Sequence, residues 1–292
     1  MRFVTITSSG MLLCLVTVLC IPSITVSDKL ADAINELQQD VNKRANNDGG
    51  MSDSHGRMLM GTVGTCDNLE DPNGIDWNGD KKDYKCDRKH TFKPNGALDP
   101  KYTKYENVRK PPPKHICMQH FRNYPFGPIN YNPVIPTAGP HRPNWPVYGE
   151  YVFMPRQRWL HSLEHGAIVF LYHPCADPIE VDKFRKIVEK CLYRHVITPN
   201  RNLTHERPFA LLSWGNIVEM SHANTREATL FIKTHAKHGL EMLHQNGRFN
   251  GSTYDRYLDN GKRLLKKAAV AIDGDKSDPH VCRYYESLSG SK

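Results

Sequence analysis

Six cysteines constrain the fold of this chain more than any other feature of its sequence. The chain has 292 residues and eight cysteines, two of which, Cys14 and Cys20, lie in an apolar segment at the N-terminus. The other six are Cys66, Cys86, Cys117, Cys175, Cys191 and Cys282. An even set of cysteines in an oxidising compartment favours disulfides over metal thiolates. Because no C-x-x-C spacing occurs, a thioredoxin-like or zinc-ribbon site has no support, and we expect three disulfide bonds.

The positions of the cysteines favour one pairing among those possible. We predict the pairs Cys175–Cys191, Cys66–Cys86 and Cys117–Cys282. The first would join the end of an expected strand to the helix that follows it, and the second would be a short-range link. The third pair would tie the C-terminus back to the rest of the domain.

The first residues predict that the chain enters the secretory pathway. Arg2 supplies a basic start, and residues 11–21 form an apolar run that is too short to span a bilayer. Small residues then precede a cleavage point near Asp28, so we predict a signal peptide over residues 1–27, with an uncleaved anchor as the alternative. No later segment has the ~18 apolar residues of a transmembrane helix. We therefore expect a secreted or lumenal, soluble protein.

Two N-x-S/T sequons agree with the secretory route. They begin at Asn202 and Asn250, both in polar, loop-like surroundings. We expect both asparagines to carry glycans.

The positive charge of the chain bears on its partners. The formal net charge of +8 is spread along the sequence and predicts a basic, solvated surface. Attraction to acidic glycans or anionic membranes is the functional alternative. An extracellular protein is not expected to bind nucleic acid, and the sequence identifies no partner, so an extracellular protein or a glycan both stay open.

The pattern along the chain predicts one domain behind a short leader. Residues 28–62 begin with an amphipathic helical stripe and continue as a polar, Gly-rich linker. We expect a single globular domain over residues 63–275. Residues 276–292 would then form a tail that is tied to the domain by Cys282.

Apolar periodicity predicts an α+β fold for this domain. A loop-rich, disulfide-pinned lobe comes first, up to residue 113. We then expect a strand over 166–172, a helix over 178–194, a strand over 195–198, a strand pair over 209–220, and helices over 225–238 and 254–272. This order suggests a split β-α-β, ferredoxin-like arrangement, in which helices pack on one face of a small, mostly antiparallel sheet.

One more predicted helix carries the residues that point most directly to chemistry. Pro155 and Gly166 bracket the string RQRWLHSLEH. His161 and His165 are four residues apart and so share a helix face, which lets two imidazoles bind one metal ion. With Glu164 they read H-x-x-E-H, the inverted zincin pattern, in which Glu164 would be the catalytic base that activates a zinc-bound water.

A metal site without catalysis requires fewer residues. His141, in a Gly-Pro-His turn, is a further imidazole that folding could bring to His161 and His165. We predict a zinc or copper site on these three histidines, with Glu164 fixing the tautomer of one of them. Other candidate ligands are His173, Glu219, Met220, His222 and His235. The alternatives are a zinc-dependent hydrolase and a metal-free interaction module, whose groove would use the aromatic residues Trp145, Tyr148, Tyr151 and Trp159.

Separate strings in this region resemble a known animal family. They are YNPVIPTAGPHRPNWPVYGEY, PRQRWLHSLEHGAIVFLYHPC, HVITP, ERPFALLSWG and VEMSH, and they fall between Cys66 and Gly239. They resemble the tumour protein p-fifty-three-inducible protein thirteen family and, through it, an uncharacterised bacterial domain with similar P-T-S-G-P-H and L-E-H-G strings.

The resemblance implies damage-induced expression and restraint of cell growth, without an assigned reaction. It also implies that His141, His161, Glu164 and His165 share one site. Vertebrate members look membrane-anchored beyond this domain, whereas this chain ends without such a segment. That difference favours a secreted form.

Overall fold

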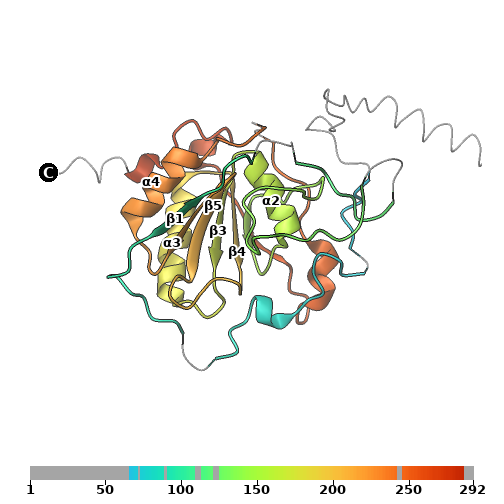
Figure 1. Ribbon diagram of the computed structural model, residues 1–292, viewed down its shortest axis with the longest axis horizontal. Helices are drawn as coiled ribbons and strands as arrows, with labels where there is room; N and C mark the ends of the chain where they lie inside the picture. The colour runs from blue at the N-terminus through green and yellow to red at the C-terminus, as the bar shows by residue number, and fades with distance from the viewer. Residues whose placement is uncertain are drawn as a thin grey trace, which may run out of the picture. The chain divides into compact units, whose positions relative to one another are not determined.

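A mixed β-sheet lies at the centre of the chain in the computed structural model (Figure 1). The structure describes residues 66–285, apart from residues 72, 89–90, 109–112, 121–124 and 242–244. Within these residues the sheet has seven strands in the order β1-β6-β5-β3-β4-β2-β7. The predicted signal peptide over 1–27 and the predicted helix and linker over 28–62 lie outside the described residues.

Between residues 149 and 235 the strands and helices follow one another with short connections, whereas longer segments separate this part from the first and the last strand. The strands are β1 Lys101–Lys104, β2 Gly149–Tyr151, β3 Ile168–Tyr172, β4 His195–Pro199, β5 Phe209–Ser213, β6 Asn216–Met220 and β7 Leu265–Ala268. The helices are α2 Arg156–Glu164, α3 Pro178–Cys191 and α4 Thr225–His235, with short 3-10 turns η1 Lys81–Asp83, η2 Ser252–Tyr257, η3 Ile272–Gly274 and η4 Arg283–Tyr285.

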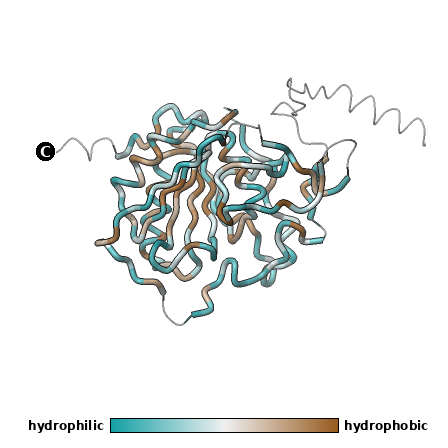
Figure 2. Tube along the Cα trace, viewed as in Figure 1, coloured by the Kyte–Doolittle hydropathy of each residue, from teal (hydrophilic) through white to brown (hydrophobic). Residues whose placement is uncertain are grey.

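The middle of the sheet is built from strands that are apolar on both faces. β3 pairs with β4 in parallel and with β5 in antiparallel orientation. Parallel neighbours require a crossover, and α3 supplies it between β3 and β4. Both strands are covered on each side, which is why GAIVFLY reads as a continuous apolar run instead of an alternating one. The central strands stand out as hydrophobic in Figure 2.

Helices α3 and α4 pack together on one face of this sheet. α3 begins at Pro178 because the Asp177 side chain accepts hydrogen bonds from the backbone N–H groups of Ile179 and Glu180. Its Phe184 and other apolar residues bury against side chains of the central strands. The Asn224 side chain caps α4 in the same way.

Helix α2 lies against the opposite face. Trp159, Leu160 and Leu163 of α2 pack in a second apolar cluster with residues of β3, β4 and β5, among them Val169 and Leu212. The predicted layer of helices on one face therefore consists of α3 and α4. α2 and the loops around it form a separate layer, and this layer contains the candidate site.

The α+β class is confirmed, but the ferredoxin-like order is not. β3 and β4 are direct neighbours, whereas a split unit places another strand between the two that the helix connects. The order of elements along the chain is the same in both cases, so the sequence could not distinguish them. The predicted helix over 254–272 is wrong as well. Asn260 and Gly261 have φ values of 39° and 72°, and this turn leaves η2 before it and β7 after it.

All six cysteines form disulfides, as predicted, but the predicted pairings are wrong. The bonds are Cys66–Cys117, Cys86–Cys175 and Cys191–Cys282. Cys175 precedes α3 and Cys191 ends it, and a helix of 14 residues is about 20 Å long, so these two cysteines cannot reach each other. Cys191 instead meets the C-terminal segment, where the Cys282 backbone N–H donates to its carbonyl.

Within the part of the chain that the structure describes, no helix combines the length and the apolar character needed to cross a bilayer.

The pairing of β2 with β7 depends on Gly149. Its φ is 145°, and a Cβ atom there would lie 2.2 Å from the carbonyl oxygen of Lys267. Gly149→Ala therefore adds backbone strain to a steric clash, and we expect the free energy of unfolding to fall by on the order of 3 kcal/mol. Guanidinium unfolding with the disulfides intact measures this. Gly96→Ala is the control, because a Cβ atom there meets nothing within 4 Å; equal stability of the two variants would contradict the prediction.

Candidate metal centre

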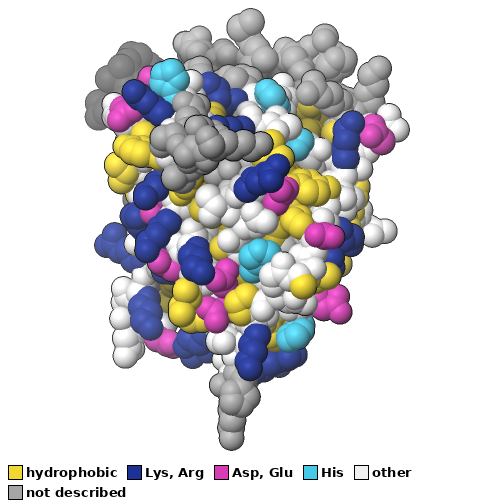
Figure 3. All heavy atoms as spheres, turned by 90° about the vertical axis from the view of Figure 1, so that its left-hand side faces the viewer, with side chains coloured by type: hydrophobic (Ala, Val, Ile, Leu, Met, Phe, Trp, Pro, Cys, Tyr) yellow, Lys and Arg dark blue, Asp and Glu magenta, His cyan; other side chains and the backbone are white. Residues whose placement is uncertain are grey.

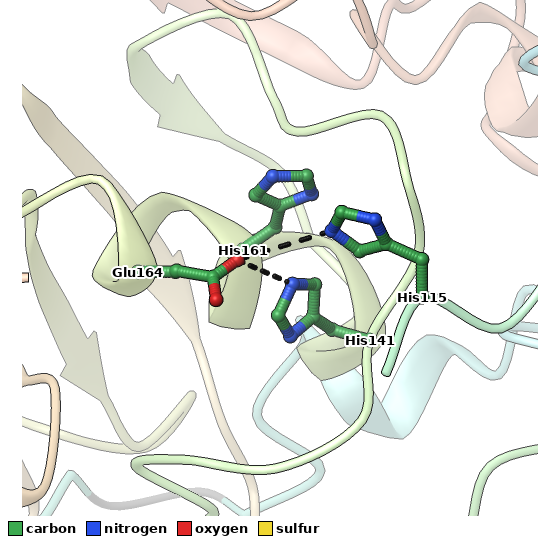
Figure 4. A group of neighbouring side chains, drawn as sticks. All are labelled: His115, His141, His161 and Glu164. Atoms are coloured by element: carbon green, nitrogen blue, oxygen red, sulfur yellow. Dashed lines mark hydrogen bonds and ion pairs between the residues drawn. The ribbon is translucent and has the colours of Figure 1, made fainter. Parts of the chain in front are cut away.

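Three segments that are far apart in the sequence meet beside the second half of α2 (Figure 4). His161 and Glu164 extend from the helix itself. His141 comes from the turn after Pro140, and His115 comes from a segment that pairs with His141 through a parallel bridge. One potential ligand atom from each of the four side chains lies within 4.8 Å of all the others. We call these four residues the His3Glu cluster.

Backbone carbonyls fix the tautomers of two of the histidines. His141 Nδ1 lies 2.8 Å from the carbonyl oxygen of Gly139, and His161 Nδ1 lies 2.7 Å from that of Arg142. A carbonyl oxygen only accepts hydrogen bonds, so each Nδ1 carries a proton and donates it. In the neutral ring the lone pair is then on Nε2, which is the arrangement found in metal-binding histidines.

Two of the ring nitrogens lie near one carboxylate oxygen. His141 Nε2 lies 3.0 Å from Glu164 Oε2, and His115 Nε2 lies 3.8 Å from the same oxygen. His161 Nε2 is buried and has no hydrogen-bond partner among the residues that the structure describes. The cluster therefore combines one carboxylate with oriented imidazoles, one of which has an unsatisfied nitrogen.

The side chains of the cluster are almost completely buried. The side chains of His141 and Glu164 are 0% and 1% exposed, and that of His115 is 11% exposed. Burial and then the neighbouring imidazoles hold the pKa of His161 well below its usual range. Burial alone would raise the pKa of Glu164, but His141 and His115 hold it well below the usual range. A carboxylate that is ionised beside a neutral imidazole is the protonation state that a metal ion requires.

A buried arginine holds the segments of the cluster together. The Arg142 guanidinium binds Asp76 with contacts of 2.7 and 2.9 Å and donates to the carbonyls of Ile116 and Cys117. The Arg142 backbone N–H donates to Gln157 of α2. His115 and His141 are therefore fixed to α2 through the residues beside them.

His165 lies next to the His3Glu cluster and is not a member of it. It directly follows α2, and its ring packs edge-on against Trp145, with centroids 4.3 Å apart. A second group of potential ligands contains His165 together with Glu164 and Glu241. The structure thus places His141 and His161 in one group, with His115 in the place that the sequence analysis gave to His165. No local sequence signal identified His115, because its position depends on the bridge to His141.

The other candidate ligands have structural contacts of their own. His173 accepts a hydrogen bond from the backbone of Cys175, and His235 packs on Phe231. Glu219 pairs with Lys101, Met220 is buried in the core, and His222 contacts the Ser221 hydroxyl. The aromatic residues predicted as a possible groove, namely Trp145, Tyr148, Tyr151 and Trp159, are core residues with at most 6% exposure. Trp145 packs against His161 and His165, and none of the four aromatic side chains offers an open surface.

Both sequons are accessible. Asn202 and Asn250 are exposed, so both side chains are accessible for the attachment of a glycan. Glycosylation stays a prediction.

A family model described as "Protein of unknown function (DUF3105)" matches residues 124–246. This range contains His141, His161, Glu164 and His165, while His115 lies before it. No curated protein and no solved structure matches the chain. The chain is therefore similar to an uncharacterised domain family over its central part, and the link to the animal family stays a prediction.

The buried imidazole of His165 makes stability depend on pH. Burial lowers its pKa to about 3, whereas an unperturbed histidine titrates near 6.5. Between these values the unfolded chain binds a proton that the folded chain does not. The free energy of unfolding, complete above pH 6.5, should therefore fall toward pH 3 by up to ~1.4 kcal/mol per pH unit.

Guanidinium unfolding in EDTA at several pH values measures this slope. His165→Phe, which keeps a flat ring without a titrating group, should have a smaller slope than the wild type. The control is His280→Phe, because His280 is exposed and its loss should leave the slope unchanged. Equal slopes in His165→Phe and the wild type would contradict the prediction.

Proposed function

We propose that the chain binds a divalent transition metal ion, zinc before others, in a closed centre formed by the His3Glu cluster. The observation that carries the proposal is the buried Nε2 atom of His161, which has no hydrogen-bond partner and belongs to a group of three further ligand side chains. A buried polar atom without a partner costs about 1–3 kcal/mol. Coordination to a metal ion removes that cost.

The donor set favours zinc over copper. Three imidazole nitrogens and one carboxylate oxygen suit the four-coordinate tetrahedral geometry of zinc. At the usual zinc–ligand distances of about 2.0 Å, adjacent ligand atoms are about 3.3 Å apart, close to the 3.0 Å between His141 Nε2 and Glu164 Oε2. Copper(I) prefers thiolate or thioether ligands, and the six described cysteines are all in disulfides.

Burial favours a structural role for this ion over a hydrolytic one. A zinc hydrolase keeps an open coordination position with a base beside it. In the His3Glu cluster the four side chains would occupy all four coordination positions of a tetrahedral ion, and Glu164 would itself be one of the ligands. The H-x-x-E-H string is therefore weak support for the hydrolase alternative, because His165 does not belong to the group of potential ligands that contains His161.

The ion would have a structural role in a secreted module, in which it cross-links separate segments of the chain. It would join the segment of His115, the turn of His141 and α2, next to the Cys66–Cys117 disulfide. The predicted signal peptide and the three disulfides support an extracellular setting. Restraint of cell growth, which the family resemblance implies, would then be exerted by this module from outside the cell.

The distribution of charged side chains on the surface favours a diffuse electrostatic attraction to acidic partners over binding at a single basic patch. Lys and Arg side chains lie among Asp and Glu side chains on the face in Figure 3. The net charge of +8 gives that surface an overall positive sign. An extracellular protein or an acidic glycan fits this distribution.

Removal of one imidazole tests the metal centre. We expect protein secreted from eukaryotic cells, without a His tag or chelators, to contain zinc in near-stoichiometric amount. His161→Ala should lower zinc affinity by on the order of 100-fold or more, since a ligand is lost. Inductively coupled plasma mass spectrometry measures the content, and competition with a chromogenic chelator measures the affinity.

The control is His280→Ala, which removes an exposed histidine and should keep the wild-type zinc content. At free zinc 100 times above the dissociation constant, the wild type should gain about 2.7 kcal/mol in the free energy of unfolding. A folded wild type that takes up no zinc, even when zinc is added back, would refute the proposal.

A further inference from the structure

We infer that the centre holds a second metal ion, bound by Glu164, His165 and Glu241, with Glu164 shared between the two positions. The inference rests on the proposed function, because it adds a neighbour to the ion in the His3Glu cluster. One potential ligand atom from each of these three residues lies within 4.8 Å of the other two. The ligand would be a divalent transition metal ion.

His165 is the residue that points to an ion at this place. Its side chain is 0% exposed, and neither ring nitrogen has a hydrogen-bond partner. His141 and His161 each satisfy Nδ1 with a backbone carbonyl, whereas none of the described residues does this for His165. A neutral imidazole buried in this way leaves both its donor and its acceptor unsatisfied, which is costly unless something binds. Coordination satisfies one nitrogen directly.

Glu241 reaches the site through a specific backbone contact. The Glu241 N–H donates to the carbonyl of Glu164 over 3.0 Å. Gly239 permits this approach, because a Cβ atom there would lie 2.0 Å from that same carbonyl oxygen. The segment after α4 is therefore fixed against the end of α2, and Glu241 is held beside His165 by main-chain packing.

The carboxylate of Glu164 is arranged to bridge two ions. Its contacts with His115 and His141 are both made by Oε2, and its other oxygen carries neither contact in Figure 4. A carboxylate that gives one oxygen to each of two ions is typical of centres with metals about 3.5–4 Å apart. The neighbouring guanidinium of Arg194 binds Asp278 and the His165 carbonyl, so its positive charge is paired with a carboxylate outside the proposed site.

The two positions would differ in their chemistry. The second has two carboxylates and one imidazole, a harder donor set than that of the first, and it suits zinc, manganese or iron(II). Three protein ligands leave one position of a four-coordinate ion to a small exogenous ligand. The first ion would then be closed and structural, and the second would be the exchangeable one.

Metal stoichiometry in full-length secreted protein tests the second position. The wild type, Glu241→Gln and Glu206→Gln are dialysed against buffered zinc, and bound zinc is measured by plasma mass spectrometry. We expect two zinc ions per chain in the wild type and one in Glu241→Gln, because an amide oxygen is a weak ligand compared with a carboxylate. Glu206 is exposed, and its glutamine variant should keep two ions.

Loading the wild type with cobalt(II) tests the second position without any variant, so the result does not depend on whether a variant folds. Two cobalt ions bridged by one carboxylate are spin-coupled, so the wild type should give a smaller electron paramagnetic resonance signal per cobalt than protein loaded with one equivalent. One zinc ion in both the wild type and Glu241→Gln would overturn the second position and leave the proposed function standing. No zinc in the wild type would overturn both, and two zinc ions in Glu241→Gln would overturn the role of Glu241.

Discussion

The buried ion pair between Arg142 and Asp76 is the interaction on which the candidate centre depends. Both side chains are fully buried, and the guanidinium also binds the carbonyls of Ile116 and Cys117. The same residue offers its own carbonyl to His161 Nδ1. One arginine thus fixes the segment of His115, the turn of His141 and the ring orientation of His161. Loss of the Asp76 carboxylate would leave the Arg142 guanidinium buried without its charged partner, a change that costs about 3–5 kcal/mol.

The centre also depends on the layer that α2 forms. α2 contributes two residues to the His3Glu cluster and contributes apolar residues such as Leu163 to the core. β3 follows α2 after a short turn, so the helix is fixed to the middle of the sheet. A second buried ion pair, between Arg158 of α2 and Asp67, ties the same helix to the N-terminal loops. The side chains of the His3Glu cluster are therefore placed by elements that have their own stability.

One physical difference separates the features that the sequence predicted from those that it missed: the former depend on local patterns and the latter on contacts between residues distant in sequence. The helix with His161 and Glu164 was predicted because Pro155 and Gly166 bound it and because i, i+4 spacing is a local property. The strand pair at 209–220 and helices α3 and α4 followed from local periodicity in the same way. His115 was missed because its position is set by a bridge to His141 and by the Arg142 contacts, which join residues distant in sequence. The disulfide pairings were wrong for the same reason, since each bond depends on the tertiary arrangement.

The Cys66–Cys117 disulfide has a consequence for the order of events in biosynthesis. Cys117 is two residues from His115, and its partner is 51 residues away in sequence. Oxidation that closes this loop would restrain the segment of His115 and so favour the geometry of the cluster. Metal acquisition would then be favoured in the oxidised chain over an incompletely oxidised one. In an oxidising lumen, metal supply and thiol oxidation would act in series on the same few residues.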